Sequence, residues 1–471
     1  MSELRLHPDR LLPAEPSVRG IARELYATVA QAPIVSPHGH VDARLLLDDE
    51  PFADPASLFV TPDHYVTRML HAVGVRLHAL GVRRLDGSGE PADPRAVWRV
   101  FCEHWTTFAG TASRHWLTDA LVNVFGVTAI PSAQTADSLY DELAARLAEE
   151  AFRPRALYAR FGVDVLATTD DPCSDLSAHR ALRDDPSWHG RVVPTFRPDA
   201  YLEAGVPGWT ARLDRLATAS GIDTTSYDGF VAALEDRRRF FVANGATATD
   251  HGHVDAAIIP LAHAEARGLF IDARAGVITA SGATALRRHL LFEMARMSCE
   301  DGLAMAIHPG VSRAHHTPTF EGYGPDTGHD IPVATEFTSS LRPMLERFGT
   351  TAGFRLIVFT VDETTWSREI APLAGFYPSV FVGAPWWFLD TPGAMRRFRE
   401  AVTDSAGFFK TAGFVDDTRA FCSIPARHDV ARRVDAGYLA SLVAEHRLDE
   451  TEAADILQAI VGRLPREAFH L

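Results

Sequence analysis

Eight short apolar runs recur along the chain, and each ends abruptly in polar residues at its carboxyl end. Stretches with helical patterning separate the runs, so strand and helix signals alternate along the sequence. Such alternation predicts parallel strands joined by helices. The runs occupy residues 33–40, 163–172, 191–199, 245–252, 302–310, 355–363, 379–388 and 408–419.

The number of runs and their polar ends favour a (β/α)8 TIM-like barrel. In a barrel, the carboxyl ends of all eight strands face one mouth, where active sites form. A doubly wound open sheet is the alternative, but its site is confined to one switch point and would not use all eight ends. We therefore predict an α/β protein with a single barrel domain over residues 1–471.

Two helical segments extend this barrel. Residues 43–160 follow the first run and carry helical spacing such as Leu139, Leu143 and Leu147, which predicts a mainly α-helical insertion. An insertion after the first strand would cover the barrel mouth. A capping-box pattern that begins at Asp449 predicts a helical C-terminal tail.

The charge balance excludes two classes of partner. Lys and Arg number 46 against 61 Asp and Glu, and the net charge of −15 repels nucleic acid and anionic membranes. The N-terminus is charged throughout, and no apolar stretch is long enough to span a membrane, so we expect a cytoplasmic protein. The sequence leaves open whether the chain forms a homo-oligomer.

The four cysteines have no short spacing and are typical of reduced thiols: Cys102, Cys173, Cys299 and Cys422.

A candidate metal site combines the first and last runs. His38 and His40 are two residues apart, so in a strand both imidazoles point to the same face. Asp417 lies in the eighth run, which pairs with the first in a closed barrel. Two imidazoles and a carboxylate would bind zinc and leave one position open. The alternatives are a surface histidine pair and, for Asp416 and Asp417, a solvated turn.

The chain contains one lysine, Lys410, which limits the metal count. A carbamylated lysine on the fourth strand bridges two metals in many barrels with this His-x-His and Asp pattern, which resembles that of the amidohydrolase superfamily. The fourth run holds no lysine, and Lys410 begins the eighth, far from the mouth. The sequence thus predicts a single divalent metal ion, for which zinc suits the ligands.

Short motifs are spaced along nearly the whole chain. They are Asp63-His64-Tyr65 with Arg68, TTDDP at 168–172 with His179, FRPD at 196–199, Asp250-His251-Gly252, GPDTG at 324–328, Trp386-Trp387-Phe388 with Asp390, and DTRAF at 417–421 with Arg427-His428. In this order they resemble the motifs of the uronate isomerase (glucuronate isomerase) family. Residues 309–316 and 360–366 depart from the family's usual pattern, which leaves the preferred uronate open.

The resemblance implies an aldose–ketose isomerase. It would interconvert D-glucuronate with D-fructuronate and D-galacturonate with D-tagaturonate, by metal-assisted proton transfer between C2 and C1. Arg197 would bind the uronate carboxylate in two hydrogen bonds, although an ion pair with Asp199 is the alternative. Arg419 shares a strand face with Asp417, so it would touch the substrate or orient that carboxylate.

Further roles follow for residues near the mouth. His64 and Tyr65 would reach in from the insertion as polar or acid-base groups, with packing as the alternative for Tyr65. Asp250 would bind sugar hydroxyls or assist proton transfer. Trp386 would form a wall against the sugar, unless it belongs to the core, and His308 would stand beside the metal without binding it.

Two other functions remain open from the residues. A mononuclear amidohydrolase-type hydrolase, such as an amidase, lactonase or deaminase, would use the same three ligands to activate water. A non-catalytic protein that binds sugar acids would keep the fold without turnover.

Overall fold

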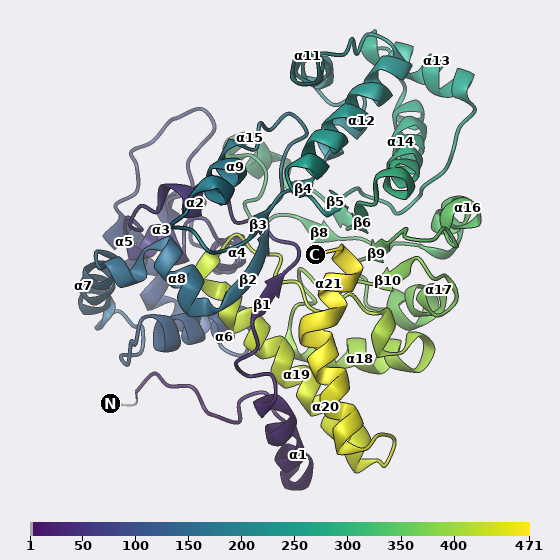
Figure 1. Ribbon diagram of the computed structural model, residues 1–471. Coiled ribbons are helices and arrows are strands. Elements are labelled where there is room, and N and C mark those ends of the chain that lie inside the picture. Colours follow the sequence, from purple (N-terminus) through teal and green to yellow (C-terminus); the bar gives the residue numbers. More distant parts are fainter. Residues whose placement is uncertain (1–2) are drawn as a thin grey trace.

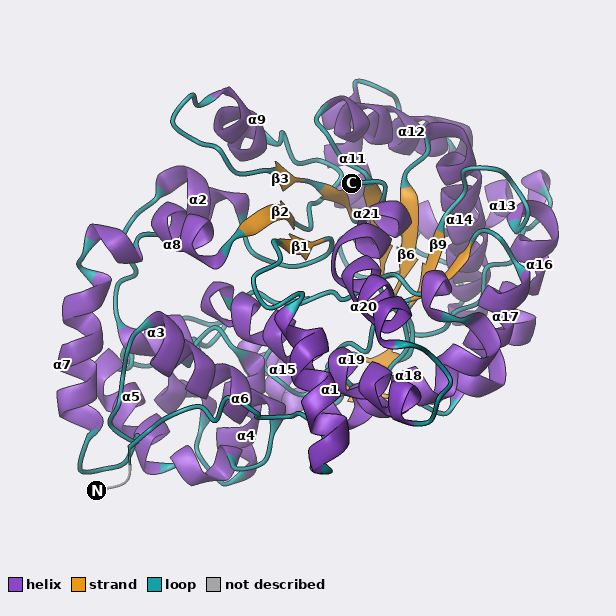
Figure 2. Ribbon diagram, turned by 60° about the horizontal axis from the view of Figure 1, so that its bottom comes forward, coloured by secondary structure: helices purple, strands orange, loops and turns teal. Residues whose placement is uncertain are grey.

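Parallel β-strands lie in the middle of the molecule, with helices packed around them (Figures 1 and 2). The computed structural model describes residues 3–471. Two parallel sheets have the strand orders β1-β2-β3 and β10-β9-β6-β5-β4. Their strands are β1 (Ile34–Ser36), β2 (Val163–Ala167), β3 (Val192–Val193), β4 (Thr195–Phe196), β5 (Ala248–His251), β6 (Ala304–Ile307), β9 (Leu356–Val358) and β10 (Val380–Val382).

The two sheets meet within the third predicted run. β3 pairs with β2, and β4 pairs with β5, so residues 192–196 contact both sheets. Pro194 separates the two short strands, and it has no N–H to donate to the ladder. The residues that follow β2 also contact β4, because Asp170 N donates to Thr195 O at 2.9 Å.

The eighth predicted run does not form a regular strand, which corrects the expectation for residues 408–419. Residues 408–410 form a 3-10 turn, and a single parallel bridge joins Thr411 to Val382 of β10. Gly413 and Asp417 have positive φ angles of 74° and 40°, which interrupt the extended backbone. The segment still adjoins the residues that follow β1, through a hydrogen bond from His40 N to Thr418 O. The parallel sheets are compatible with a TIM-like barrel.

The stretch between β1 and β2 is helical, and its apolar side chains share one hydrophobic cluster with Ile34 of β1 and Leu166 of β2. Leu139, Leu143 and Leu147 are buried along one face of α7, as their spacing predicted. Figure 1 shows these helices gathered on one side of the strands. They are α2 (Ala43–Asp48), α3 (Pro55–Phe59), α4 (His64–Ala72), α5 (Pro94–Glu103), α6 (Ala112–Asp119), α7 (Ala136–Leu147) and α8 (Pro154–Phe161).

The other helices flank the sheets or form the C-terminal tail. In the tail, the Asp449 carboxylate accepts a hydrogen bond from Glu452 N and caps α20, which fits the predicted helix start. These helices are α1 (Pro16–Ala27), α9 (Ser177–Asp184), α10 (Asp199–Leu202), α11 (Trp209–Ser220), α12 (Tyr227–Ala243), α13 (His263–Arg274), α14 (Ala280–Asp301), α16 (Thr338–Phe348), α17 (Ala371–Phe376), α18 (Pro392–Ala406), α19 (Ile424–Ala444), α20 (Glu450–Gln458) and α21 (Leu464–Phe469).

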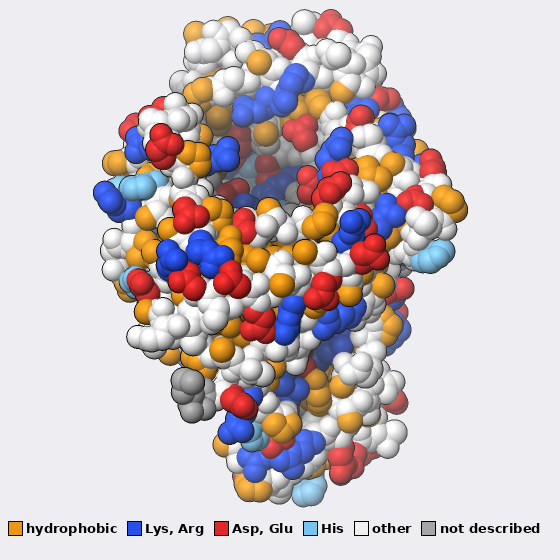
Figure 3. All heavy atoms as spheres, turned by 90° about the vertical axis from the view of Figure 1, so that its left-hand side faces the viewer, with side chains coloured by type: hydrophobic (Ala, Val, Ile, Leu, Met, Phe, Trp, Pro, Cys, Tyr) orange, Lys and Arg blue, Asp and Glu red, His pale blue; other side chains and the backbone are white. Residues whose placement is uncertain are grey.

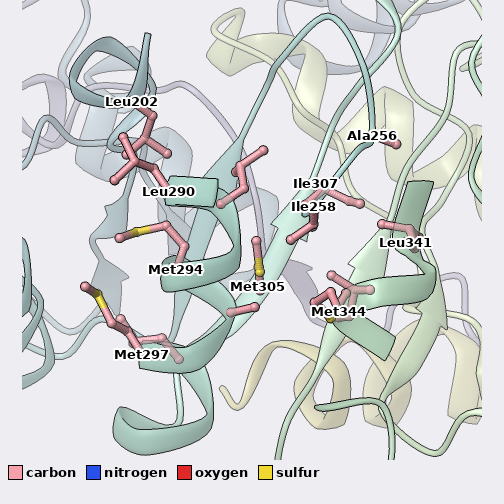
Figure 4. Packing of buried hydrophobic residues seen from close by; sticks show 14 of the residues in the cluster. Leu202, Ala256, Ile258, Leu290, Met294, Met297, Met305, Ile307, Leu341 and Met344 are labelled. Carbon is pink, nitrogen blue, oxygen red and sulfur yellow. The ribbon is translucent and has the colours of Figure 1, made fainter. Parts of the chain in front are cut away.

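The largest core cluster lies between the sheet β10-β9-β6-β5-β4 and the helices that flank it, among them α14 and α16. Figure 4 shows Met294 of α14 and Met344 of α16 near Met305 of β6. All four residues of β6 are buried, as expected for a parallel strand covered on both faces. Among residues 3–471, no helix is both long and apolar enough to cross a membrane.

An antiparallel pair that the sequence did not predict follows β6. It consists of β7 (Val311–Ser312) and β8 (Ile331–Pro332), with α15 (Thr317–Tyr323) between them. The pair includes part of the segment 309–316 that departs from the family pattern. It fixes a long loop at the carboxyl end of β6, next to the candidate site.

Candidate active site

The three predicted metal ligands lie together where β1 meets the eighth run. Asp417 Oδ1 lies 2.9 Å from His40 Nε2 and 3.3 Å from His38 Nε2. The backbone fixes this arrangement, because Asp417 N donates to His38 O and His40 N donates to Thr418 O. Residues from opposite ends of the chain therefore form one group, which we call the strand-end group: His38, His40 and Asp417.

The local backbone permits this close approach. A Cβ on Gly39 would lie 3.2 Å from Asp416 Oδ1, which is tighter than most contacts in proteins. Asp416 accepts a hydrogen bond from His428 Nε2 at 3.0 Å and takes no part in the strand-end group. Asp417 has a φ of 40°, an uncommon conformation for a non-glycine residue that is often found at functional sites.

His308 stands against the same group at the carboxyl end of β6. Its ring stacks on His38 with 4.7 Å between centroids. Its Nδ1 lies 2.7 Å from Asp250 Oδ1, whereas its buried Nε2 has no hydrogen-bond partner. Ligand atoms of His38, His308 and Asp417 all lie within 4.8 Å of one another. His308 is thus closer to a coordinating position than the sequence suggested.

The donor set fits a divalent transition metal. Imidazoles with one carboxylate are typical zinc ligands. Burial raises the pKa of Asp417, but the imidazoles of His40 and His38 outweigh this effect and hold that pKa well below its ordinary value. Asp417 Oδ1 and His308 Nε2 are buried without a hydrogen-bond partner, and a cation would satisfy both.

Arg197 extends from the end of β4 and is held by two carboxylates. Its Nε lies 3.1 Å from Asp199 Oδ2, and its Nη1 lies 3.1 Å from Asp250 Oδ2. The ion pair with Asp199, which the sequence offered as the alternative, is therefore present, yet Arg197 also lines the cavity at the strand ends. A Cβ on Gly252 would lie only 2.8 Å from Arg197 Nη2, so the glycine makes room for the guanidinium.

Asp250 lies behind the cavity and does not line it. The side chain is 1% exposed, and its two oxygens contact His308 and Arg197. Burial raises the pKa of Asp250, but Arg197 and then His308 reverse the shift and hold it well below the ordinary value. The geometry thus suits Asp250 to orienting these two side chains better than to direct contact with a sugar.

His64 and Tyr65 enter the cavity from α4, whose first turn is capped by Asp63. His64 Nδ1 is buried without a partner, and burial together with the positive charge of Arg419 lowers the pKa of His64 to about 4. The Tyr65 hydroxyl donates to Asp390 Oδ2 at 2.9 Å, and the ring packs edge-on against Trp116. His64 is therefore a neutral polar group, whereas Tyr65 is held mainly by packing.

These side chains surround a cavity of about 400 Å³, a volume suited to a small ligand. A space-filling view shows a deep hollow in one face of the molecule, with acidic and basic side chains inside (Figure 3). The predicted residues that line the cavity are His40, His64, Tyr65, Arg197, Trp386, Asp417 and Arg419, whereas His38 and Asp250 do not.

Three further residues that line the cavity, Arg313, Asp326 and Asp330, were not assigned a role from the sequence. Arg313 pairs with Asp330 at 3.1 Å, and Arg419 pairs with Asp326 at 3.3 Å. Arg313 falls in the divergent segment 309–316, and Asp326 belongs to the GPDTG motif, which was the one available signal. The cavity thus contains three arginines, and each has at least one carboxylate partner.

Trp386 and Trp387 form an aromatic side of the cavity. The Trp386 ring meets His308 edge-on at 4.7 Å, and its buried Nε1 has no hydrogen-bond partner. Trp386 is 5% exposed, so it belongs both to the core and to the cavity wall.

Comparison with known proteins gives matches over the full length of the chain. A family model described as glucuronate isomerase matches residues 17–466. A uronate isomerase of Cutibacterium acnes is 51% identical over 468 residues, which cover 99% of each chain.

Two crystal structures also match along nearly the whole chain. A glucuronate isomerase from Caulobacter crescentus has a TM-score of 0.97 and 46% identity, over 99% of this chain and 97% of that one. A uronate isomerase from Thermotoga maritima has a TM-score of 0.91 and 26% identity, over 99% of both chains. Sequence and fold agree along the entire length, and the chain belongs to the glucuronate isomerase family.

Proposed function

We propose that this protein is a uronate isomerase that interconverts D-glucuronate with D-fructuronate and D-galacturonate with D-tagaturonate. The observation that carries the proposal is the strand-end group at a cavity that also holds Arg197 and Arg419. A divalent metal and an anionic sugar would meet there. The full-length similarity to uronate isomerases supports the same reaction.

The strand-end group would hold one divalent metal ion in the cavity, and zinc suits its donors. When bound, such an ion supplies Lewis-acid polarisation of a carbonyl or hydroxyl oxygen on the sugar. Two buried atoms without a hydrogen-bond partner support the assignment: Asp417 Oδ1 within the group and His308 Nε2 beside it.

Arg197 and Arg419 would bind the carboxylate of the uronate. Asp199 and Asp250 hold two of the Arg197 nitrogens, so its planar fork is already oriented before the substrate arrives. The Arg419 side chain is more exposed than that of Arg197 and pairs with a single carboxylate, that of Asp326 at 3.3 Å. Trp386 would pack against the apolar face of the sugar.

Proton transfer between C2 and C1 would use the groups that face the cavity. The carboxylate of Asp417 has two oxygens, so one can face the metal while the other accepts a proton. His64 is neutral near pH 7 and would hydrogen-bond to a sugar hydroxyl, beside Tyr65. Asp250 would act as a positioning residue through Arg197 and His308.

The whole chain, 1–471, would form one (β/α)8 barrel domain, with residues 43–160 covering its mouth. The bridge from the eighth run to β10 and its hydrogen bonds to His38 and His40, just after β1, support closure. His64 lies in this helical stretch and lines the cavity, which supports the covering role. Cys102 and the other three free thiols suit a cytoplasmic enzyme.

The test is incubation of the metal-loaded protein with a panel of uronates and neutral hexoses, followed by detection of ketose. We expect ketose from uronates and its loss after metal removal. Turnover in D₂O should place deuterium at the carbon that exchanges its proton. Release of acid or ammonia without ketose would favour a hydrolase, and binding without any turnover would favour a non-catalytic protein.

A further inference from the structure

A second group of metal-binding side chains lies behind Arg197. Asp199 begins α10, His251 ends β5, and His253 follows two residues later. Asp199 Oδ1 lies 3.3 Å from His253 Nε2 and 3.9 Å from His251 Nδ1. One ligand atom from each residue lies within 4.8 Å of the other two. The histidines are 1% and 4% exposed, so the group belongs to the interior.

Hydrogen bonding leaves three lone pairs facing one another in this group. His253 Nδ1 lies 2.7 Å from Glu203 Oε1, and a carboxylate only accepts, so Nδ1 carries the proton and Nε2 of the neutral ring does not. His251 Nε2 lies 3.0 Å from the hydroxyl of Thr249. That hydroxyl can donate to a backbone oxygen, which leaves His251 Nε2 as the donor and Nδ1 as the lone pair.

The carboxylate completes the set. Asp199 Oδ2 accepts from Gly252 N at 2.9 Å and from Arg197 Nε at 3.1 Å. No hydrogen bond reaches Asp199 Oδ1, His251 Nδ1 or His253 Nε2, although all three atoms are buried. Three buried acceptors without a donor are costly unless a positive charge lies between them.

The separations suit a coordinated ion. With bonds of about 2.1 Å, neighbouring ligand atoms around tetrahedral zinc lie about 3.4 Å apart. The values of 3.3 and 3.9 Å in this group are close to that separation, as is the 3.3 Å between His38 and Asp417 in the strand-end group. Glu203 holds the outer nitrogen of His253, as carboxylates do for metal-bound histidines.

The sequence repeats itself at the two groups. Residues 38–43 and 251–256 both read HGHVDA, and each copy stands at the carboxyl end of a parallel strand. In each copy a glycine separates two histidines that lie next to an aspartate from elsewhere in the chain, Asp417 or Asp199. The same six residues therefore produce two similar donor sets.

We propose that Asp199, His251 and His253 bind a second divalent transition-metal ion, with zinc as the best match to the donors. The ion is structural, because the group lies outside the lining of the cavity. By fixing Asp199, it holds the carboxylate whose other oxygen orients Arg197. The site rests on these contacts alone and does not depend on the reaction proposed for the cavity.

Counting bound metal tests the site. Protein stripped with a chelator, then reloaded with Zn²⁺ or Co²⁺ and passed through gel filtration, should carry two equivalents per chain by elemental analysis. His38→Ala/His40→Ala should retain one equivalent, and His251→Ala/His253→Ala should also retain one. A matched control is His289→Gln, a buried histidine bound to Tyr227, which should retain two.

Asp199→Asn keeps the shape of the side chain, so it tests the site even if the His251→Ala/His253→Ala variant does not fold. This substitution should weaken binding of the second ion at least tenfold. Anomalous scattering at the zinc edge should give a peak between Asp199 and the two histidines. One equivalent in the wild type that disappears with His38→Ala/His40→Ala would overturn the proposal. One equivalent that survives that change but is lost with Asp199→Asn would support this site and count against the strand-end assignment.

Discussion

Replacing Gly252 with alanine should weaken catalysis by displacing Arg197, the side chain that an added Cβ would approach most closely. A Cβ at residue 252 would lie 2.8 Å from Arg197 Nη2, whereas ordinary contact begins at 3.4 Å, so the guanidinium must withdraw by about 0.6 Å. A free arginine would make that shift easily. Arg197 is not free, because Asp199 and Asp250 each hold one of its nitrogens at 3.1 Å.

The size of the effect follows from that displacement. A misplacement of about 1 Å in a positioning group can cost about a hundredfold in rate. For the smaller shift at Arg197 we expect roughly a tenfold fall in kcat/KM for uronates, about 1.4 kcal/mol of transition-state stabilisation. The assay is the initial rate of ketose formation from D-glucuronate and D-galacturonate, with thermal unfolding and metal content measured on the same samples.

Gly20→Ala is the matched control, because Gly20 lies in α1 and a Cβ there would meet nothing within 4 Å. That variant should keep wild-type kcat/KM and gain a little stability from the better helix former. A folded, metal-loaded Gly252→Ala protein with unchanged kcat/KM would refute the argument that Arg197 is held where the substrate needs it.

Four other outcomes are expected. Replacing both His38 and His40 with alanine should remove the ion of the cavity and the activity together, as metal analysis and the ketose assay would reveal; metal content equal to wild type with activity abolished would refute this ligand assignment. Arg197→Lys should lower kcat/KM for uronates at least tenfold, because a point charge replaces a planar fork. The pKa of His64 falls from 6.5 to about 4 on folding, so the unfolded chain binds more protons between these two pH values. The free energy of unfolding should therefore fall as the pH drops through that range, by at most about 1.4 kcal/mol per pH unit. His64→Gln should flatten this pH dependence, as measured by urea titrations. Lys410 donates to backbone oxygens beside β10, so Lys410→Met should leave the metal content unchanged.

Strand positions were predictable because hydrophobic runs report burial directly. Seven of the eight runs contain a strand, since parallel strands covered on both faces need continuous apolar residues. The prediction of a strand in the eighth run was wrong because the backbone there is irregular. The positive φ of Asp417 interrupts the extended conformation, and a hydrophobicity pattern does not reveal such an angle. The break between β3 and β4 coincides with Pro194, a residue that the sequence shows but that the pattern of hydrophobic runs does not take into account.

The strand-end group was predictable for a different reason. His38 and His40 share a face through local geometry, and contact between the first and eighth runs supplies the partner Asp417 without any detailed packing. Arg313 and Asp330 were not predictable, because their place in the cavity depends on the pairing of β7 with β8 across a long loop. Such a pairing joins only two residues from each strand, so its sequence signal is too short to recognise.

Arg197 illustrates where sequence reasoning posed a false choice. The FRPD motif allowed either a structural ion pair or a substrate contact, and the two seemed to exclude each other. A guanidinium has five N–H donors, and the ion pairs to Asp199 and Asp250 engage only Nε and Nη1. The remaining donors, including those on Nη2, have no carboxylate partner, and the residue still lines the cavity. The ion pairs would therefore hold the side chain in place for the substrate carboxylate that we propose it binds, so the structural and binding roles are compatible.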